Sequence, residues 1–182
     1  MLQGVSVFYD GRQVCGDISF EIVRGDRIAL RGKNGSGKSS ILKLICGEEI
    51  NYSGNLWIGS GIKISYISQD TSQLRGSLSD YADENGLDES VFKAMLRKLD
   101  FSRTQFEKDM SEFSGGQKKK VLISRSLCES AHLYIWDEPL NFVDVLSRMQ
   151  IEKLLLEYKP TIIFVEHDSA FCESIATKTV EL

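Results

Sequence analysis

The sequence predicts an α/β fold in which a mostly parallel core sheet is flanked by helices. Two observations support this prediction. In the last third of the chain, strand-like apolar runs alternate with helical segments, and strands that alternate with helices usually lie parallel. Near the amino terminus, a glycine-rich loop follows a strand-like run and precedes a helix. Ligands of such sheets bind at the carboxyl ends of the strands, so we expect the functional residues there.

The first third of the chain is predicted to be rich in strands. Apolar residues recur within these segments, and turns at residues 10–11 and 24–26 separate the first three of them. The glycine-rich loop then leads into a helix at residues 40–46, which Gly47 ends. The predicted strands are residues 5–9, 18–23, 27–31, 55–58 and 62–67.

The rest of the chain is predicted to change from a helical region to alternating elements. Residues 78–108 have a helical and polar pattern, in which Asp88 can cap a helix whose apolar residues, Val91 to Leu99, recur three and four apart. No repeat or low-complexity linker follows, so one compact unit is expected. The remaining predicted helices are residues 116–129, 145–158 and a short one near Ala170, and the remaining strands are residues 133–136, 161–165 and 179–182.

Length and composition limit the class of protein. The chain has 182 residues, which suits one domain with a continuous core. No run approaches the roughly 20 apolar residues of a membrane span, and the amino terminus lacks the features of a signal peptide. We therefore expect a cytoplasmic protein without direct membrane insertion. The net charge of -4 gives no general attraction for polyanions, so DNA binding is not expected.

The four cysteines are predicted to be small core residues. They stand far apart and form no Cys-x-x-Cys pair, which argues against a zinc site and against a disulfide framework. The residues concerned are Cys15, Cys46, Cys128 and Cys172.

Residues 32–39 match the complete pattern of a phosphate-binding P-loop, in the strand-to-helix context that the pattern requires. Glycines let backbone N–H groups turn toward phosphate, and the helix amino terminus adds a positive dipole end. Lys38 is predicted to reach the terminal phosphates, and Ser39 to bind Mg²⁺. The alternative is a glycine-rich turn without a ligand. The residues expected to bind ATP are Gly32, Asn34, Gly35, Ser36, Gly37, Lys38, Ser39 and Ser40.

Two carboxylates, Asp137 and Glu138, follow the predicted strand at residues 133–136, where a parallel sheet presents groups to a nucleotide. Asp137 suits Mg²⁺, usually through water. Glu138 would act as a general base on the attacking water if it lies within hydrogen-bond reach of that water. The alternative is a pair of acids that only cap the strand end.

A third motif opens the predicted helix at residues 116–129. A serine and two glycines at a helix start form a second phosphate-binding terminus. One nucleotide cannot easily use both termini within one monomer, so we expect Ser114 to complete a site on a second copy of the fold. An ordinary serine cap is the alternative. The residues of this motif are Ser114, Gly115, Gly116 and Gln117.

The order of these three motifs resembles that of ABC-type ATPases over nearly the whole chain. The resemblance implies a P-loop NTPase fold of the ABC type, with an antiparallel β subdomain. It also implies that residues 1–182 are a single nucleotide-binding domain with a short helical subdomain inserted at about residues 70–114. Such a domain would bind Mg-ATP and hydrolyse it weakly when isolated, because the active form pairs two cassettes.

The same resemblance implies roles for residues outside the three motifs. Tyr9 would stack on adenine, with Phe8 as its competitor and a core tyrosine as the alternative. Gln69 would touch Mg²⁺ and water, unless it is only an exposed glutamine at a strand end. Asp144 would communicate across the dimer, and His167 would contact the γ-phosphate rather than serve as a structural histidine.

Finer features resemble the ABC-F family of ATPases. Residues 113–121 and 137–144 match its motifs, the latter with Asn141. Leu140 and Phe142 stand where most members have threonine and histidine. In this respect the sequence resembles the subgroup that protects ribosomes from antibiotics.

The resemblance to ABC-F proteins also implies partners. These proteins carry two cassettes in one chain, so the sequence resembles a fragment, most similar to the carboxyl-terminal cassette. The implied partners are a second cassette, in the same chain or as a homodimer, and the ribosome. The motor subunit of a membrane transporter is the alternative, although the stretch between Gln69 and Ser114 is short for one. A structural or DNA-repair ABC ATPase is a third class. Residues 118–120, three lysines, would contact RNA or form a solvated helix face.

Overall fold

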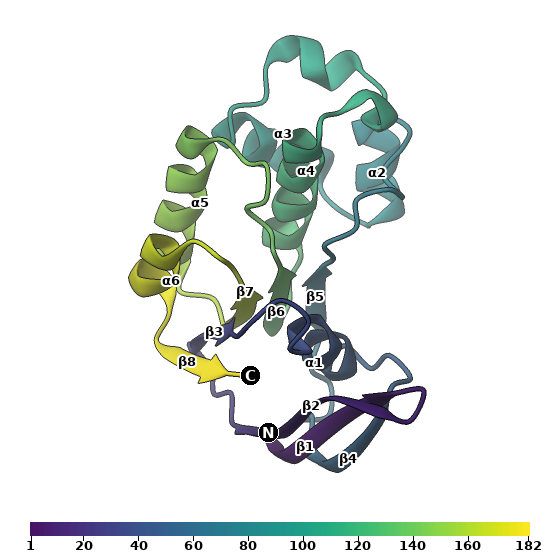
Figure 1. The fold of residues 1–182 in the computed structure, drawn as a ribbon. Helices are drawn as coiled ribbons and strands as arrows, with labels where there is room; N and C mark the ends of the chain where they lie inside the picture. The colour runs from purple at the N-terminus through teal and green to yellow at the C-terminus, as the bar shows by residue number, and fades with distance from the viewer. The chain divides into compact units, whose positions relative to one another are not determined.

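The computed structural model describes residues 1–182, which form two compact units (Figure 1). The first, called the strand unit here, comprises Met1–Tyr66, Ala131–Asp137 and Lys159–Leu182. The second, the helical unit, comprises Ile67–Ser130 and Glu138–Tyr158. None of the helices is long and apolar enough to cross a membrane.

An antiparallel sheet of three strands lies in the strand unit, in the order β2-β1-β4. Asp10 and Gly11 both have left-handed backbone conformations, with φ of 49° and 75°, and they connect β1 to β2 so that Tyr9 pairs with Arg12. This conformation matches the right-handed twist of a hairpin, and it confirms the predicted turn. The strands are β1 (Leu2–Tyr9), β2 (Arg12–Phe20) and β4 (Asn51–Leu56).

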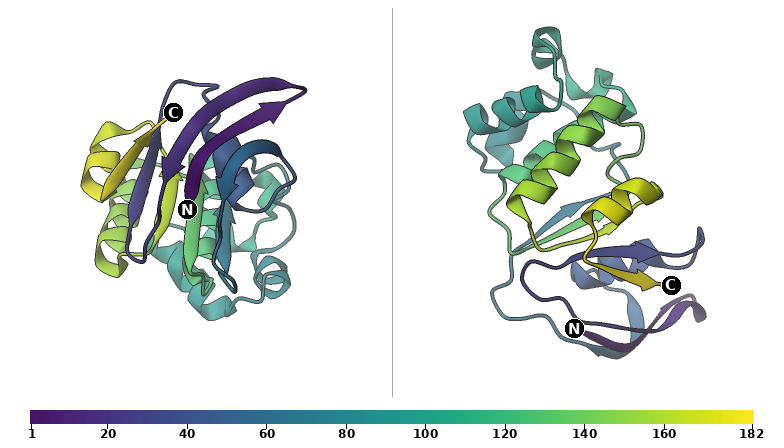
Figure 2. Two further views of the ribbon diagram at one scale, coloured as in Figure 1. Left: turned by 90° about the horizontal axis from the view of Figure 1, so that it is seen from below. Right: turned by 90° about the vertical axis from the view of Figure 1, so that its left-hand side faces the viewer.

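The second sheet has five strands, in the order β5-β6-β7-β3-β8, and its central pairs are parallel (Figure 2). Every residue of β7 is buried, as expected for an inner strand of a parallel sheet. The predicted parallel sheet is thereby confirmed. Its strands are β3 (Arg27–Arg31), β5 (Ile64–Ile67), β6 (Leu133–Asp137), β7 (Ile162–Val165) and β8 (Lys178–Glu181).

One hydrophobic core serves both sheets of the strand unit. It combines inward-facing residues such as Val5 of β1 and Ile163 of β7 with Ile41 and Leu42 of helix α1 (Lys38–Ile45). Helix α1 packs against β6 and β7, and a second helix, α6 (Ser169–Ile175), follows β7 in the chain. The loop before α1 therefore starts from a rigid strand and ends on a helix that the core holds.

The helical unit contains the segment predicted to be helical and polar. Asp88 caps its second helix by accepting a hydrogen bond from the Val91 backbone nitrogen at 3.0 Å, as predicted. Phe92 and Leu96 are buried, but Val91 is 52% exposed, so the apolar face is narrower than the sequence pattern indicates. The elements are α2 (Leu78–Glu84), α3 (Glu89–Lys98), α4 (Gly115–Cys128) and α5 (Val145–Tyr158), with single-turn helices η1 (Arg103–Glu107) and η2 (Met110–Glu112).

Several predicted boundaries differ from the structure, among them the starts of β1 and β5, which lie at Leu2 and Ile64 rather than at residues 5 and 62. Strand β4 begins at residue 51 rather than 55, because five of its six residues are exposed and no alternation of burial marks it. Strand β2 covers residues 12–20 rather than 18–23. Helix α1 begins at Lys38 rather than residue 40, since Gly37 takes a left-handed conformation immediately before it. Of the four unpaired cysteines, Cys15 and Cys172 are buried as predicted, and the other two are half-buried.

Candidate active site

The loop between β3 and α1 follows a path that only glycine allows at two positions. Gly32 and Gly37 have φ of 150° and 92°. A Cβ atom on Gly32 would lie 2.5 Å from the backbone oxygen of Leu182 and 2.7 Å from Oγ of Ser36. A Cβ atom on Gly37 would lie 2.9 Å from the sulfur of Cys15 in β2. Close packing on both sides therefore fixes the shape of this loop.

Two side chains inside the loop suit an anionic ligand. Lys38 is buried, and its amino group donates to the backbone oxygens of Gly32 at 3.0 Å and Lys33 at 2.9 Å. The hydroxyl of Ser36 is buried and makes no hydrogen bond within the chain. A buried hydroxyl without a partner costs about 1–3 kcal/mol, which a ligand with acceptor oxygens would recover. The loop thus fits the phosphate groups that the sequence predicts.

Parallel pairing brings three strand ends to one edge of the sheet. Leu30 of β3 and Asp137 of β6 both pair with Val165 of β7, so the loop after β3, the carboxylate that ends β6 and His167 share that edge. Asp137 is 2% exposed. The edge therefore gathers the groups that nucleotide chemistry needs, as expected of the carboxyl ends of parallel strands.

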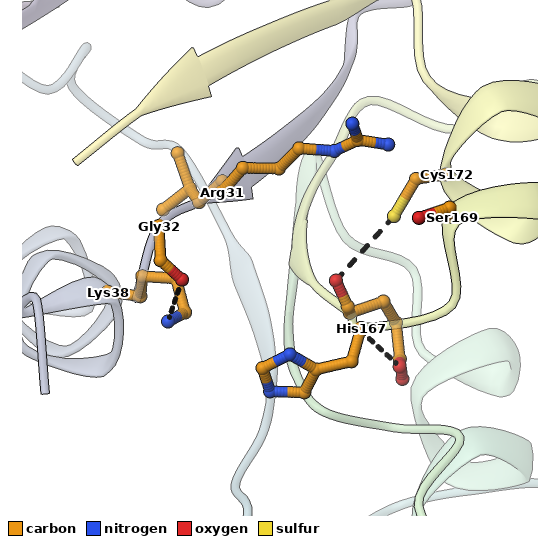
Figure 3. Close-up of a pocket in the computed structure, with 8 residues that line it drawn as sticks. Arg31, Gly32, Lys38, His167, Ser169 and Cys172 are labelled. Atoms are coloured by element: carbon orange, nitrogen blue, oxygen red, sulfur yellow. Dashed lines mark hydrogen bonds between the residues drawn. The ribbon is translucent and has the colours of Figure 1, made fainter. Parts of the chain in front are cut away.

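A cavity of about 190 Å³ opens beside the loop (Figure 3). The imidazole of His167 points toward the side where Lys38 lies. Asp168 fixes the turn after His167, because it caps α6 through a 3.0 Å hydrogen bond from the backbone nitrogen of Phe171. Burial raises the pKa of the Cys172 thiol, which donates to the backbone oxygen of Glu166. The lining residues are Leu30, Arg31, Gly32, Lys38, Glu166, His167, Ser169 and Cys172.

In the helical unit, two amide groups orient the carboxylate of Glu138. Nε2 of Gln69 donates to Oε2 of Glu138 at 2.7 Å, and Nδ2 of Asn141 donates to the same oxygen at 2.5 Å. Gln69 follows the end of β5 and is exposed, as in the alternative of an exposed strand-end glutamine. Its side chain nevertheless has a defined contact, with Glu138. A carboxylate held from two directions keeps one orientation, which a general base requires.

The loop that carries Glu138 has an unusual backbone. Glu138 and Phe142 both have positive φ, 48° and 64°, a conformation that is rare outside glycine and costly unless the surroundings impose it. Arg148 of α5 imposes part of it by donating to the backbone oxygens of Val143 at 3.0 Å and Leu140 at 3.2 Å. The loop is therefore anchored on α5.

The helix α4 begins with a reciprocal cap. The hydroxyl of Ser114 accepts from the backbone nitrogen of Gln117 at 3.3 Å, and the side chain of Gln117 accepts from the backbone nitrogen of Ser114 at 2.9 Å. Ser114 is thus a helix cap in this structure, and it remains exposed together with Gly115. The predicted contact of Ser114 with a nucleotide on a second cassette stays a prediction.

The interpretation of residues 118–120 as a solvated or RNA-binding face is wrong for two of the three lysines. Lys119 and Lys120 are only 3% and 6% exposed. Lys119 donates to the backbone oxygen of Ser68 at 3.1 Å, and Lys120 forms a 2.6 Å ion pair with Asp144. The sequence pattern failed because long lysine stems pack along apolar surface while their amino groups reach internal acceptors.

Asp144 caps α5 and is strongly acidic. Burial alone would raise its pKa, but the Lys120 ammonium and two hydrogen bonds from Ser147, both of 2.9 Å, lower the pKa to about 2. The carboxylate is therefore ionised throughout the neutral range. Its contacts in this chain are within the helical unit, and the predicted role across a dimer stays a prediction.

A family model described as ABC transporter matches residues 15–141, more than half of the chain. The chain belongs to the ABC transporter family. It is an ABC ATPase cassette. ABC ATPase domains bind ATP, and membership of this family implies ATP hydrolysis.

Three relatives of this cassette have names that differ from one another. It is 30% identical to the ATP-binding protein Uup of Caulobacter vibrioides, over 99% of this chain and 31% of that protein. It is 30% identical to the ribosome protection protein VmlR of Bacillus subtilis, over 94% and 32% respectively. It is 29% identical to ABC transporter F family member 2 of Arabidopsis thaliana, over 96% and 26%. The chain thus spans about a third of the length of these relatives.

A solved structure, the ATP binding subunit of an ABC transporter, superposes with a TM-score of 0.75 and 27% identity, over all of this chain and 84% of that one. This similarity confirms the fold that the sequence resemblance implies, including the additional antiparallel sheet and the helical region.

Tyr9 of the cassette is not a core residue. It lies at the tip of the β1–β2 hairpin and is 43% exposed, whereas Phe8 is half-buried. The alternative of a core tyrosine is therefore excluded, and stacking on adenine stays a prediction.

The predicted magnesium ligands, Ser39, Gln69 and Asp137, also stay predictions. No group of three or more histidine, cysteine or acidic side chains is arranged to hold a metal in this chain. Mg²⁺ in nucleotide sites usually takes only one or two protein ligands, together with phosphate oxygens and water.

Sequence reasoning missed several residues that contact Glu138, support the segments around it or line the cavity in the strand unit. The sequence contained Asn141 three positions after Glu138, but nothing in the pattern indicated that its amide turns back to the carboxylate. The burial of Lys119 and Lys120 has no signal in a run of three lysines. Arg31 and Cys172 were missed because they line the cavity only through the pairing of β3 and the position of α6.

The two glycines of the α4 motif should differ in their tolerance of a side chain. A Cβ atom on Gly116 would lie 2.2 Å from the backbone oxygen of Phe142, whereas one on Gly115 would lie 3.4 Å from the exposed ring of the same residue. We expect Gly116→Ala to reduce the free energy of unfolding by about 2 kcal/mol or more and Gly115→Ala to change it by less than about 1 kcal/mol. Urea denaturation measures both, and equal losses would contradict the close approach of α4 to residue 142.

Proposed function

We propose that this cassette binds Mg-ATP in the loop at residues 32–39 and hydrolyses it when paired with a second cassette. The observation that carries the proposal is the buried Lys38, whose amino group is held by the backbone oxygens of Gly32 and Lys33 at the end of a buried strand. An ammonium group is expensive to enclose unless its charge is used, and a polyphosphate at this loop uses it. The unpartnered hydroxyl of Ser36 supports the same ligand.

Each residue of the site has one task in the proposed reaction. Lys38 and His167 stabilise negative charge on the phosphoryl group that is transferred. Glu138 accepts a proton from the attacking water, and its carboxylate is oriented for this by Gln69 and Asn141. When bound, Mg²⁺ neutralises charge on the phosphate oxygens, and Ser39 and Asp137 are the residues that would hold it. Tyr9 would stack on the adenine ring.

The start of α4 supports the proposal of a second cassette. Ser114 and Gly115 are exposed at a helix amino terminus, which carries positive dipole charge and backbone donors for phosphate. Family members typically pair two cassettes, and the proposed pairing places this terminus on the nucleotide of the partner. Residues 70–114 would then be the helical insertion of a single domain, and the second cassette would lie in the same chain or in a second copy.

We further propose that the whole protein is a cytoplasmic ABC-F factor that acts on the ribosome, in which this chain is the carboxyl-terminal cassette. The support is the similarity to a protein named for ribosome protection and to one named as an F family member. Antibiotic resistance would be the consequence of such protection. The second candidate is a motor subunit of a membrane transporter, favoured by the structural similarity to an ATP binding subunit.

Removing the ammonium group of Lys38 tests nucleotide binding. We expect Lys38→Ala to weaken ATP binding by at least about tenfold, because a charge-assisted hydrogen bond is lost. The matched control is Lys33→Ala in the same loop, whose exposed side chain should change the affinity by less than about threefold. Titration with a fluorescent ATP analogue measures both. Equal effects of the two substitutions would contradict the assigned ligand position.

Removing the base tests hydrolysis and pairing. We expect Glu138→Gln to keep ATP affinity, to lower turnover by about 10²-fold or more and to accumulate as a nucleotide-bound dimer in light scattering. Glu157→Gln, at an exposed position on α5, is the control and should turn over normally. Full turnover by Glu138→Gln would remove the assigned base, and robust turnover by a strictly monomeric sample would contradict pairing.

Sedimentation separates the two candidate roles of the whole protein. We expect the full-length protein with Glu138→Gln to sediment with ribosomes in the presence of ATP, because the trapped form keeps its partner, and to lose this association when Lys38→Ala is added. Recovery with membrane vesicles instead of ribosomes would favour the transporter subunit.

A further inference from the structure

Two neighbouring lysines of α4 are buried, although the sequence gives no reason for it. Lys119 and Lys120 are 3% and 6% exposed, whereas Lys118 before them is half-buried. Taking an ammonium group out of water is costly unless charge and hydrogen bonds compensate. The contacts that these two amino groups make are therefore a specific feature of the helical unit.

Lys119 holds the segment that carries Gln69. Its amino group donates to the backbone oxygen of Ser68 at 3.1 Å. The next residue, Gln69, donates to the Glu138 carboxylate at 2.7 Å. A single peptide unit therefore separates the lysine contact from the glutamine whose amide orients the base.

Lys120 holds the segment that carries Asn141. Its amino group lies 2.6 Å from a carboxylate oxygen of Asp144, the residue that caps α5. Three residues before Asp144, the amide of Asn141 donates to the same oxygen of Glu138 that Gln69 contacts. Each lysine thus fixes one of the two segments whose amides meet at Glu138.

Resting on the proposed role of Glu138, we infer that Lys119 and Lys120 are positioning residues for ATP hydrolysis. They tie the Gln69 segment and the Asn141 segment to the helix that begins at Ser114. The orientation of the Glu138 carboxylate therefore depends on α4, the same helix that carries the exposed terminus at Ser114. Movement of α4 would therefore change the contacts of the base.

A purely structural role would favour different residues. The Asp144 side chain of the Lys120–Asp144 pair is 48% exposed, and an ion pair that is open to solvent contributes little to stability, so this pair is not explained by stability alone. Holding two separate segments in register with one helix is what the two lysine contacts add.

Lysine-to-methionine substitutions in the full-length protein test this inference, since methionine keeps the apolar stem and removes the charge. We expect Lys119→Met and Lys120→Met each to lower kcat by about tenfold or more while ATP affinity changes by less than threefold. Lys118→Met is the matched control on the same helix and should keep the kcat of the unmodified protein. Lys119→Arg and Lys120→Arg should restore most of kcat, because the charge returns.

Double substitutions show whether each lysine acts through its segment. Lys119→Met should lower kcat no further in a Gln69→Ala background, and Lys120→Met no further in an Asn141→Ala background. Independent, multiplying losses in these backgrounds would overturn the inference, as would an unchanged kcat in both single variants. Equal losses of kcat and ATP affinity would overturn it too, because they indicate general disruption.

Folding and the proposed function are checked separately. If Lys120→Met does not fold, Asp144→Asn removes the same ion pair from its other side, and we expect the same loss of kcat with ATP affinity retained. An unchanged kcat in Asp144→Asn would overturn the role of Lys120. Normal turnover by Glu138→Gln would show that the proposed base is wrong, whereas its inactivity beside fully active lysine variants would show that only the positioning role is wrong.

Discussion

The structure of the strand unit depends on the parallel pairing of β3 with β7. This pairing places Leu30 beside Val165, and the residues that follow each strand therefore leave the sheet at one edge. The pairing thereby brings the glycine-rich loop and His167 to that edge. Because both strands lie within a closely packed core, a shift of one against the other would expose apolar surface at about 25 cal/mol per Å². The burial of apolar residues in β3 and β7, rather than contacts among the functional residues, thus keeps the two strand ends in place.

The helical unit solves a different problem, which is to hold one carboxylate on an irregular loop. Glu138 has a left-handed backbone, and its side chain receives two amides from segments far apart in the sequence. Helix α5 supports the loop through Arg148, and helix α4 supports it through buried lysines. Several polar contacts of this unit therefore hold the loop, which is consistent with a site where strain is imposed by surrounding structure.

The sequence predicted what depends on pattern and left out what depends on side-chain reach. The parallel sheet, the turn at Asp10 and the cap at Asp88 follow from local preferences, and the structure contains all three. The start of β4 was misplaced, because an exposed edge strand has no alternation of burial. The contacts of Asn141 and Lys119 were not predicted at all. They join residues through long flexible side chains, whose direction the sequence does not determine.

The burial of two lysines in a run of three has a consequence for the chemistry of the protein surface. An unprotected run of this kind would be open to trypsin and to acetylation at every amino group. Here only the half-buried Lys118 is accessible to a protease or an acetylating reagent. Lys119 and Lys120 become reactive only when α4 separates from the segments around Ser68 and Asp144. The rate at which these two amino groups react therefore reports local opening of the helical unit.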